Sequence, residues 1–421
     1  MALVSGAVHA AATDPATLDH GWPERLGHPL LVALTAIGPV SFQIFLPSLP
    51  AIQEGFRVQP GTAQLALSLS MAGIAAAALA SGWLADRFGR RGALLVGMSV
   101  MLIGSLMCAA APSIWTLIAG RIVQAAGGAS GMVVSRAIVL DLYGREEAGK
   151  VMARLIAAMV VAPMLATPLG GLINDTLGWR GNFLVVAASA LAMLVLVARH
   201  LPETKPASQG GTGGSGRGAG GVLRDYRELF RSAEFDAFAF QGAFAMAAFI
   251  AFMTAAPYFI TGTLGLSATA YGLCTVIVSV GFLAGSVLTT RLPESVGLER
   301  KVLAGSVLAL AAAAAALGLA LAGVWTVWAL IGPATFLGMA NGLAMPSAQT
   351  GAVGAIPRLA GTASGLSGFL GTVIAALATQ VVGMAQNGTP YPIVVAMVLG
   401  SGLALAAAAP LARRRVVAAP A

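Results

Sequence analysis

Charged residues are scarce in this chain. Asp, Glu, Lys and Arg make up only 10% of its 421 residues, and the mean hydropathy is +0.85. Soluble globular proteins carry about 25% charged residues, so the composition excludes that class. The net charge of +8 would suit a nucleic-acid partner. The distribution of the positive residues along the chain decides whether that explanation is needed.

Residues that ligate metals or form disulfides are also few. The two cysteines, Cys108 and Cys274, lie in apolar stretches, and the four histidines, at positions 9, 20, 28 and 200, lie outside or at the edges of such stretches. Buried free cysteines usually act as small packing residues. The sequence therefore predicts no disulfide, no metal site and no cofactor. It also contains no cluster of acids or nucleophiles typical of a membrane-embedded enzyme, so no catalytic residue is assigned.

Apolar sequence is what the chain has in abundance, in blocks of about 20 residues from Leu30 onward. About 20 apolar residues in a helix cross the hydrocarbon core of a bilayer. Backbone groups within lipid must be satisfied internally, which favours helices. We therefore predict an all-α membrane protein with twelve transmembrane helices, at residues 27–50, 62–84, 92–112, 115–142, 150–175, 181–200, 236–261, 269–291, 299–322, 325–349, 359–385 and 390–411.

The positive residues follow a topological pattern. With these helices, all but four of the 24 Lys and Arg residues fall in the loops and termini of one side. The exceptions are Arg57 and Arg180 in opposite loops, and Arg121 and Arg136 within the fourth helix. Cytoplasmic loops carry such an excess, so both termini are expected in the cytoplasm. The basic charge thus has a topological explanation, and no nucleic-acid partner is expected.

A connection of about 35 residues divides the helices into six and six. Its Gly-rich part, 209–221, has the composition of a flexible linker and lacks the Gly-Lys-Ser/Thr ending of a phosphate-binding loop. Residues 223–231 can form a short amphipathic helix on the membrane surface. The expected organisation is a cytoplasmic segment 1–26, a bundle 27–200, the linker with its short helix 201–235, a second bundle 236–411 and a cytoplasmic tail 412–421.

A faint internal repeat supports this division. Leu-Ala-Thr at 165–167, followed by Gly171, recurs as Leu-Ala-Thr at 377–379, followed by Gly383. Two parallel six-helix repeats with a cavity between them are typical of transporters.

Several motifs resemble those of the major facilitator superfamily, and specifically the drug-efflux branch typified by bicyclomycin and chloramphenicol resistance proteins (Bcr/CflA type). They lie at residues 46–52, 82–91, 120–127, 136–141, 163–171, 178–180 and 361–371. The resemblance covers nearly all of residues 30–411. It implies the major facilitator fold, with two six-helix pseudo-repeats, in a bacterial inner membrane. It also implies export of small amphipathic molecules by alternating access.

The glycines and the charged residues of the loop 82–91 can be given separate physical roles. Gly82 and Gly89 permit close helix approach and a tight turn. By resemblance, Asp86 and Arg90 meet Asp141 at the cytoplasmic end of the fourth helix, as a gate latch that holds one conformational state. The alternative is that the loop arginines only set topology.

Among the residues of the expected helices, Arg121 has the highest free-energy cost of burial. It lies about 9 Å deep in the fourth helix at 1.5 Å per residue, where a charge needs a partner or a wet cavity. It either snorkels to the outer interface or, as the resemblance implies, faces the cavity and takes part in substrate contact or proton movement. Gln124, almost one turn further on, is a cavity or a packing residue, and Arg136 is expected to snorkel to the cytoplasmic interface.

Further cavity candidates come from helices one, seven and ten, which line the cavity in the superfamily. Gln43 and Asn341 are amides that need a partner or water if buried. The aromatic candidates are Phe249, Phe252 and Tyr258, for which ordinary lipid or helix contact is the alternative.

The stretch 163–171 resembles the antiporter motif of helix five, with Thr167 where the family usually has proline. Pro163 and Pro168 remove backbone donors and kink the helix, while Gly170 and Gly171 allow a close crossing. Packing alone would also explain these residues. The motif weakly favours export over import.

The acid that this branch generally carries in helix one is missing, because Gln43 occupies its position. None of the sixteen acidic residues falls at the middle of an expected helix. A glutamine cannot take up and release a proton. Coupling could therefore use Asp141 or Asp86 at the inner gate, rely on a charged substrate and the membrane potential, or be absent.

The leading functional prediction is a secondary transporter that exports small amphipathic molecules, as a monomer in membrane lipid, with protons as a candidate coupling ion. Import or facilitated passage of a metabolite, or an inactive transporter-like scaffold, are the alternatives. Because Arg121 would repel cations in a cavity without carboxylates, neutral, zwitterionic or anionic amphiphiles are the expected substrates.

Overall fold

The fold is entirely helical in the part of the chain that the structure describes. The computed structural model describes residues 27–143, 145–204, 219–293 and 295–417, and for Asp86 and a few others only the backbone. Within these ranges twelve segments are long and apolar enough to cross a membrane, which confirms the predicted fold class. The expected N-terminal segment 1–26 and most of the Gly-rich linker lie outside the described residues.

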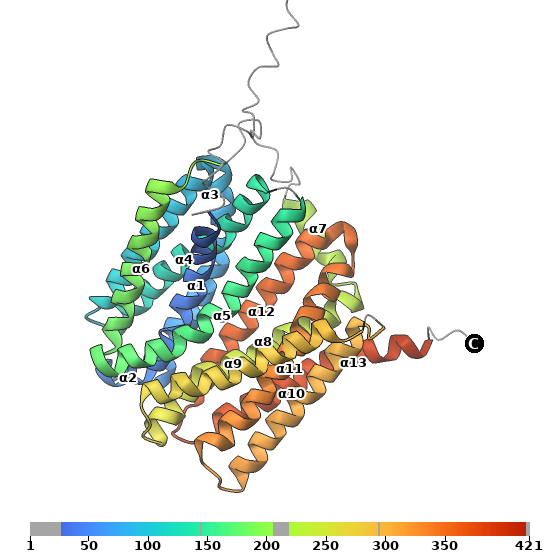
Figure 1. The fold of residues 1–421 in the computed structure, drawn as a ribbon. Helices are drawn as coiled ribbons and strands as arrows, with labels where there is room; N and C mark the ends of the chain where they lie inside the picture. The colour runs from blue at the N-terminus through green and yellow to red at the C-terminus, as the bar shows by residue number, and fades with distance from the viewer. Residues whose placement is uncertain (1–26, 144, 205–218, 294, 418–421) are drawn as a thin grey trace, which may run out of the picture.

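The helices form two bundles, blue to green and yellow to red in Figure 1. The N-terminal bundle contains α1 (His28–Gln43), η3 (Leu46–Ser48), α2 (Leu49–Phe56), α3 (Pro60–Ala109), α4 (Ile114–Leu142), α5 (Arg145–Leu177) and α6 (Trp179–His200). The short α7 (Ala219–Leu229) follows the linker. The C-terminal bundle contains α8 (Ala233–Pro257), η4 (Tyr258–Thr263), α9 (Ala268–Arg291), α10 (Leu298–Leu321), α11 (Val327–Gly354), η5 (Pro357–Leu359), α12 (Ala360–Ala385) and α13 (Tyr391–Val417).

Two helices differ from the sequence expectation in ways that proline and glycine explain. The first helix continues to Phe56 but is interrupted after Gln43, and Pro47 and Pro50 are the second residues of the two segments that follow. Proline lacks an N–H and fits the first turn of a new helix better than a helix interior. The second and third expected helices join as α3, with a sharp break at Gly89, where φ is +81°.

The two ends of the bundle are distinguished by what they carry. The linker end holds the Gly89 break and residues 200–204, and the distal end holds the turns at Gly178, Gly265 and Gly323. At the distal end α4, α9 and α11 begin with hydroxyl caps, in which Ser113, Ser267 and Thr326 accept a backbone N–H three residues later. Such caps satisfy donors that a helix terminus leaves free, so the helix starts are well defined there.

The bundles meet along two pairs of helices, α5 with α9 and α3 with α12. Small residues permit the crossing of α5 and α9. A Cβ at Gly171 would collide with the carbonyl oxygen of Ala268, and one at Gly272 would collide with Pro168. Close helix crossings of this kind stabilise membrane bundles through van der Waals packing. The two pairs hold the bundles together on either side of a central cavity.

Candidate functional site

A cavity of about 470 Å³ lies between the two bundles. Its wall comes from α1, α3, α4 and α5 on one side and from α8, α9, α11 and α12 on the other. On α4 the lining positions run from Arg121, near the distal end, to Met132, closer to the linker end. The cavity therefore has its floor near the level of Arg121 and extends toward the linker end.

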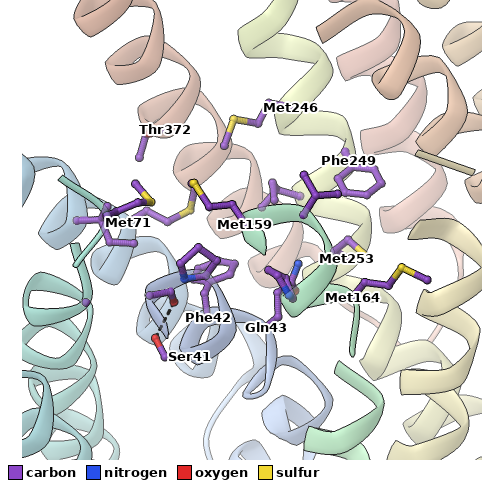
Figure 2. A pocket seen from close by; sticks show the side chains of 18 of the residues that line it. Ser41, Phe42, Gln43, Met71, Met159, Met164, Met246, Phe249, Met253 and Thr372 are labelled. Atoms are coloured by element: carbon purple, nitrogen blue, oxygen red, sulfur yellow. Dashed lines mark hydrogen bonds between the residues drawn. The ribbon is translucent and has the colours of Figure 1, made fainter. Parts of the chain in front are cut away.

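Methionine dominates the cavity wall. Seven of the 16 methionines in the chain line it, and five of them, with their sulfurs, are labelled in Figure 2. The seven are Met71, Met132, Met159, Met164, Met246, Met253 and Met345. Methionine side chains are flexible and polarisable, and such surfaces adapt to ligands of different shape. The wall therefore suits apolar ligands without enforcing one shape.

Arg121 is the single charged residue among the described residues that line the cavity. Its side chain is fully buried. The Nη1 atom donates to the carbonyl oxygen of Ser41 at 3.2 Å and to the side-chain oxygen of Gln124. The guanidinium also stacks over Phe45, with Cζ 4.4 Å from the ring centroid. These contacts offset part of the cost of burying the charge.

Gln124 holds Arg121 in place from behind the cavity wall. It is fully buried, and its Nε2 donates to the hydroxyl of Ser105 at 2.8 Å, while Ser105 donates to the carbonyl of Met101. This chain of hydrogen bonds orients the amide oxygen of Gln124 toward the guanidinium. Gln124 thus positions Arg121 and does not itself line the cavity.

Three polar atoms at the cavity floor have no protein partner. They are Nε and Nη2 of Arg121 and Oε1 of Gln43, all buried. A buried polar group without a partner is costly unless water or a ligand satisfies it. Two donors and one acceptor therefore lie unsatisfied at the floor of a mainly apolar chamber.

The other predicted cavity residues divide into two groups. Gln43, Phe249 and Pro163 line the cavity. Phe252 and Tyr258 instead pack in the hydrophobic core that surrounds the distal half of the bundles, and do not line the cavity.

Asn341 also lies away from the cavity wall. It is buried in α11, where its Nδ2 donates to the backbone carbonyl of Leu337 at 3.0 Å, one turn earlier.

The structure brings two of the predicted gate residues together at the linker end. Arg90 Nε donates to Asp141 Oδ2 at 2.8 Å, and both side chains are mostly buried. The side chain of Asp86 lies outside the described residues. A Cβ at Gly82 would meet no described atom within 4 Å, so close helix approach does not explain this glycine.

Glu203 completes this cluster. Its carboxylate accepts the backbone N–H groups of Arg90 at 2.8 Å and Arg91 at 3.3 Å, just after the break at Gly89. A carboxylate at the first turn of a helix satisfies free N–H groups and complements the helix dipole. Glu203 therefore anchors the end of α6 to the loop that carries Arg90, a role that sequence reasoning missed.

The helix-five motif makes contacts on two sides of α5. Gly170 lies against α1, where an added Cβ would collide with the carbonyl oxygen of Ile44, and Gly171 lies against α9. Pro168 packs on Gly272 of α9. The motif therefore sits where the N-terminal bundle contacts the C-terminal bundle.

Hydrogen bonds also close the distal end between the bundles. Asp175 on α5 accepts from the backbone N–H groups of Ala268 (3.2 Å) and Thr269 (2.8 Å) and from the Thr269 hydroxyl (2.6 Å). Gln380 on α12 donates to the carbonyl of Gly61 and accepts from Ser68 on α3, both at 3.0 Å. The cavity floor is therefore sealed from the distal side by contacts that cross from one bundle to the other.

Sequence reasoning missed the methionine wall, Glu203 and Asp175. The seven methionines are spread over five helices, α3, α4, α5, α8 and α11, so only the folded chain gathers them. For Asp175 the available signal was an acid near a helix end beside the Pro-Gly motif, and for Glu203 an acid directly after the sixth helix.

Comparisons with known proteins agree with this architecture. The sequence model of the Major Facilitator Superfamily matches residues 31–379. Multidrug resistance protein D of Escherichia coli (strain K12) is 27% identical over 81% of this chain and 84% of its own length. A bicyclomycin resistance protein homolog of Haemophilus influenzae is 26% identical over 86% and 90%. Among solved structures, an inward-facing, occupied bacterial homolog of the human lysosomal transporter Spinster superposes with a TM-score of 0.71, at 16% identity over 92% of this chain and 96% of the other.

Proposed function

Because the chain belongs to the Major Facilitator Superfamily, whose sequence model spans residues 31–379, we propose that it exports small amphipathic molecules by alternating access. The chain is a multi-pass membrane transport protein, and no enzymatic activity is assigned to it. Relatives whose names denote multidrug and bicyclomycin resistance support export of drug-like compounds.

One observation carries the proposal: among the described residues of the cavity wall, seven are methionines and a single one, Arg121, is charged. A sugar or a peptide carries many hydroxyl or amide groups, and burying them without hydrogen-bond partners is costly. Here the described lining is mainly apolar, with Arg121, Gln43 and three hydroxyl residues as its polar members. This composition favours amphipathic ligands that bind mostly through apolar contact.

The mode of coupling follows from what the cavity contains. Gln43 lines it, and no carboxylate is among its described lining residues. For proton-coupled transport, the proton-binding group would lie outside the described lining, and Asp141, paired with Arg90, is the candidate that we propose. Uncoupled, facilitated movement is the alternative, because none of the described lining residues requires an ion to accompany the substrate.

Orientation is part of the proposal. We place the chain as a monomer in a bacterial inner membrane, with the linker end and both termini in the cytoplasm and with no nucleic-acid partner. The excess of Lys and Arg in the loops of the linker end supports this orientation. Reporter fusions at the two termini that respond from opposite sides of the membrane would contradict it.

The test of export is drug susceptibility in an efflux-deficient bacterium that expresses the full chain. We expect resistance to neutral amphiphiles, reduced in Arg121→Ala and unchanged in Arg300→Gln, which alters an exposed arginine outside the cavity. Equal resistance in cells with and without the chain, with the chain detected in the membrane of the former, would refute export. Gln43→Asp tests coupling: if a proton gradient drives transport only in this variant, the natural protein is uncoupled or uses another ion.

A further inference from the structure

A second arginine lies on the cavity-lining face of α4. The lining positions on this helix are 121, 125, 128, 129 and 132, a spacing of three and four that defines one helix face. Arg136 follows Met132 by four residues and therefore continues the same face by one turn toward the linker end. Its side chain is exposed, unlike that of Arg121.

A direct contact places Arg136 at the mouth of the cavity. Its Nη2 atom lies 3.4 Å from the sulfur of Met159, a residue of α5 that lines the cavity and is labelled in Figure 2. The guanidinium thus rests on the rim of the methionine wall. The sequence analysis expects Arg136 to snorkel to the cytoplasmic interface. In the structure its exposed side chain also contacts this cavity-lining residue.

We propose that Arg136 is a specificity-determining residue at the cavity entrance, where it favours organic anions and disfavours organic cations. The proposal rests on the proposed function and names its substrate class: neutral or anionic amphiphiles, with carboxylate or sulfonate groups as the favoured charges. Arg136 at the mouth and Arg121 at the floor lie on one face of α4, 15 residues apart, about 22 Å along the axis at 1.5 Å per residue.

The physical basis is the positive electrostatic potential between Arg136 at the cavity mouth and Arg121 at its floor. Among the described residues that line the cavity none is acidic, and Asp141, five residues after Arg136, is paired with Arg90. A charge lining the entrance of a low-dielectric cleft raises the local concentration of ions of opposite sign and speeds their entry. A unit charge passing about 10 Å from the guanidinium, at an effective dielectric constant of about 40, changes its entry rate by about fourfold.

The test uses three probes that share a dansyl fluorophore but differ in charge: dansylglycine (anionic), dansylamide (neutral) and dansylcadaverine (cationic). The purified full chain is placed in nanodiscs of zwitterionic phosphatidylcholine, and association rate constants are measured by stopped-flow fluorescence. In Arg136→Gln we expect association about fourfold slower for dansylglycine, about fourfold faster for dansylcadaverine, and unchanged for dansylamide.

Matched variants and salt separate a charge effect from a structural one. Arg136→Lys keeps the charge and should behave like the wild type, as should Arg300→Gln, which removes an exposed arginine elsewhere. The difference between wild type and Arg136→Gln should vanish at 1 M salt, where the Debye length falls to about 3 Å.

Two failures can be told apart. If the wild-type chain binds dansylamide but Arg136→Gln changes all three probes equally, or none, the entrance role of Arg136 is wrong and the proposed function stands. If the wild-type chain binds none of the three probes, both the proposed function and the entrance role of Arg136 are wrong.

Discussion

Removal of the Asp175 carboxylate should loosen the distal closure between the bundles. In α9 the first three helical N–H groups are satisfied by two side chains. Ser267, on the same helix, accepts from Ala270, and Asp175, from the other bundle, accepts from Ala268 and Thr269. The distal closure thus depends on a helix cap that one bundle provides for the other.

The magnitude follows from the contacts that would be lost. Replacing a capping acid by alanine costs about 1 kcal/mol, and the lost interaction with the helix dipole adds about 0.3 to 1 kcal/mol. Asp175 is exposed, so solvent screening keeps the total at the lower end, about 1 kcal/mol. Asp175→Ala should therefore lower the ratio of distal-closed to distal-open molecules by about fivefold.

The assay is the distance distribution between two spin labels at the distal end. Labels at Glu54→Cys and Val324→Cys, which are exposed on opposite bundles, report the closure in a chain with Cys108→Ala and Cys274→Ala. Asp175→Ala should enlarge the long-distance population. Thr176→Val is the matched control, because its hydroxyl bonds only within α5. An unchanged distribution in Asp175→Ala would show that the cap does not hold the bundles together.

Three further predictions concern packing and positioning. Gly170→Leu should lower the thermal unfolding temperature of the purified protein by several degrees, because its side chain would collide with α1, whereas Gly361→Leu, with open space around it, should leave that temperature nearly unchanged. Phe252→Ala should destabilise the chain by about 3 kcal/mol while the rank order of ligand affinities is kept, whereas Phe249→Ala, on the cavity wall, should change ligand affinity; the opposite pattern would contradict the two placements. Glu203→Gln should cost about 1 kcal/mol, measured by thermal unfolding, and an unchanged stability would mean that its contacts with Arg90 and Arg91 are worth nothing in solution.

The helices were predictable because lipid makes apolar length decisive. All twelve spans were expected, and most boundaries agree within a few residues. The larger departures occur where local chemistry overrides hydropathy. The first helix is longer than expected because a proline lies at the start of each of the two segments that extend it. Helix α11 runs on to Gly354 because neither a proline nor a charged residue follows residue 349 until Pro357.

The site was less predictable because it depends on which helix faces meet. The depth of Arg121 in its helix was readable from the sequence, but its partners Ser41 and Phe45 come from α1. Phe249 and Phe252 are three residues apart on one helix, yet only Phe249 lines the cavity. Hydropathy does not distinguish these two phenylalanines. The methionine wall has no local pattern at all.

The two carboxylates that cap helices could not be found from sequence for a related reason. Glu203 and Asp175 each satisfy the first turn of a helix about 90 to 115 residues away. Capping is ordinarily recognised from residues adjacent to the helix start. A cap supplied by a distant segment has no such local signature.

The central claim is that one methionine-lined cavity between the bundles holds the transported molecule. Its most direct test is photolabelling of the purified chain with a neutral aryl-azide amphiphile, followed by peptide mass spectrometry. The account predicts adducts within residues 38–43, 159–164 and 246–253 that an unlabelled amphiphile suppresses. Adducts confined to exposed residues outside the cavity, such as Leu169 and Leu399, or adducts insensitive to the competitor, would contradict it.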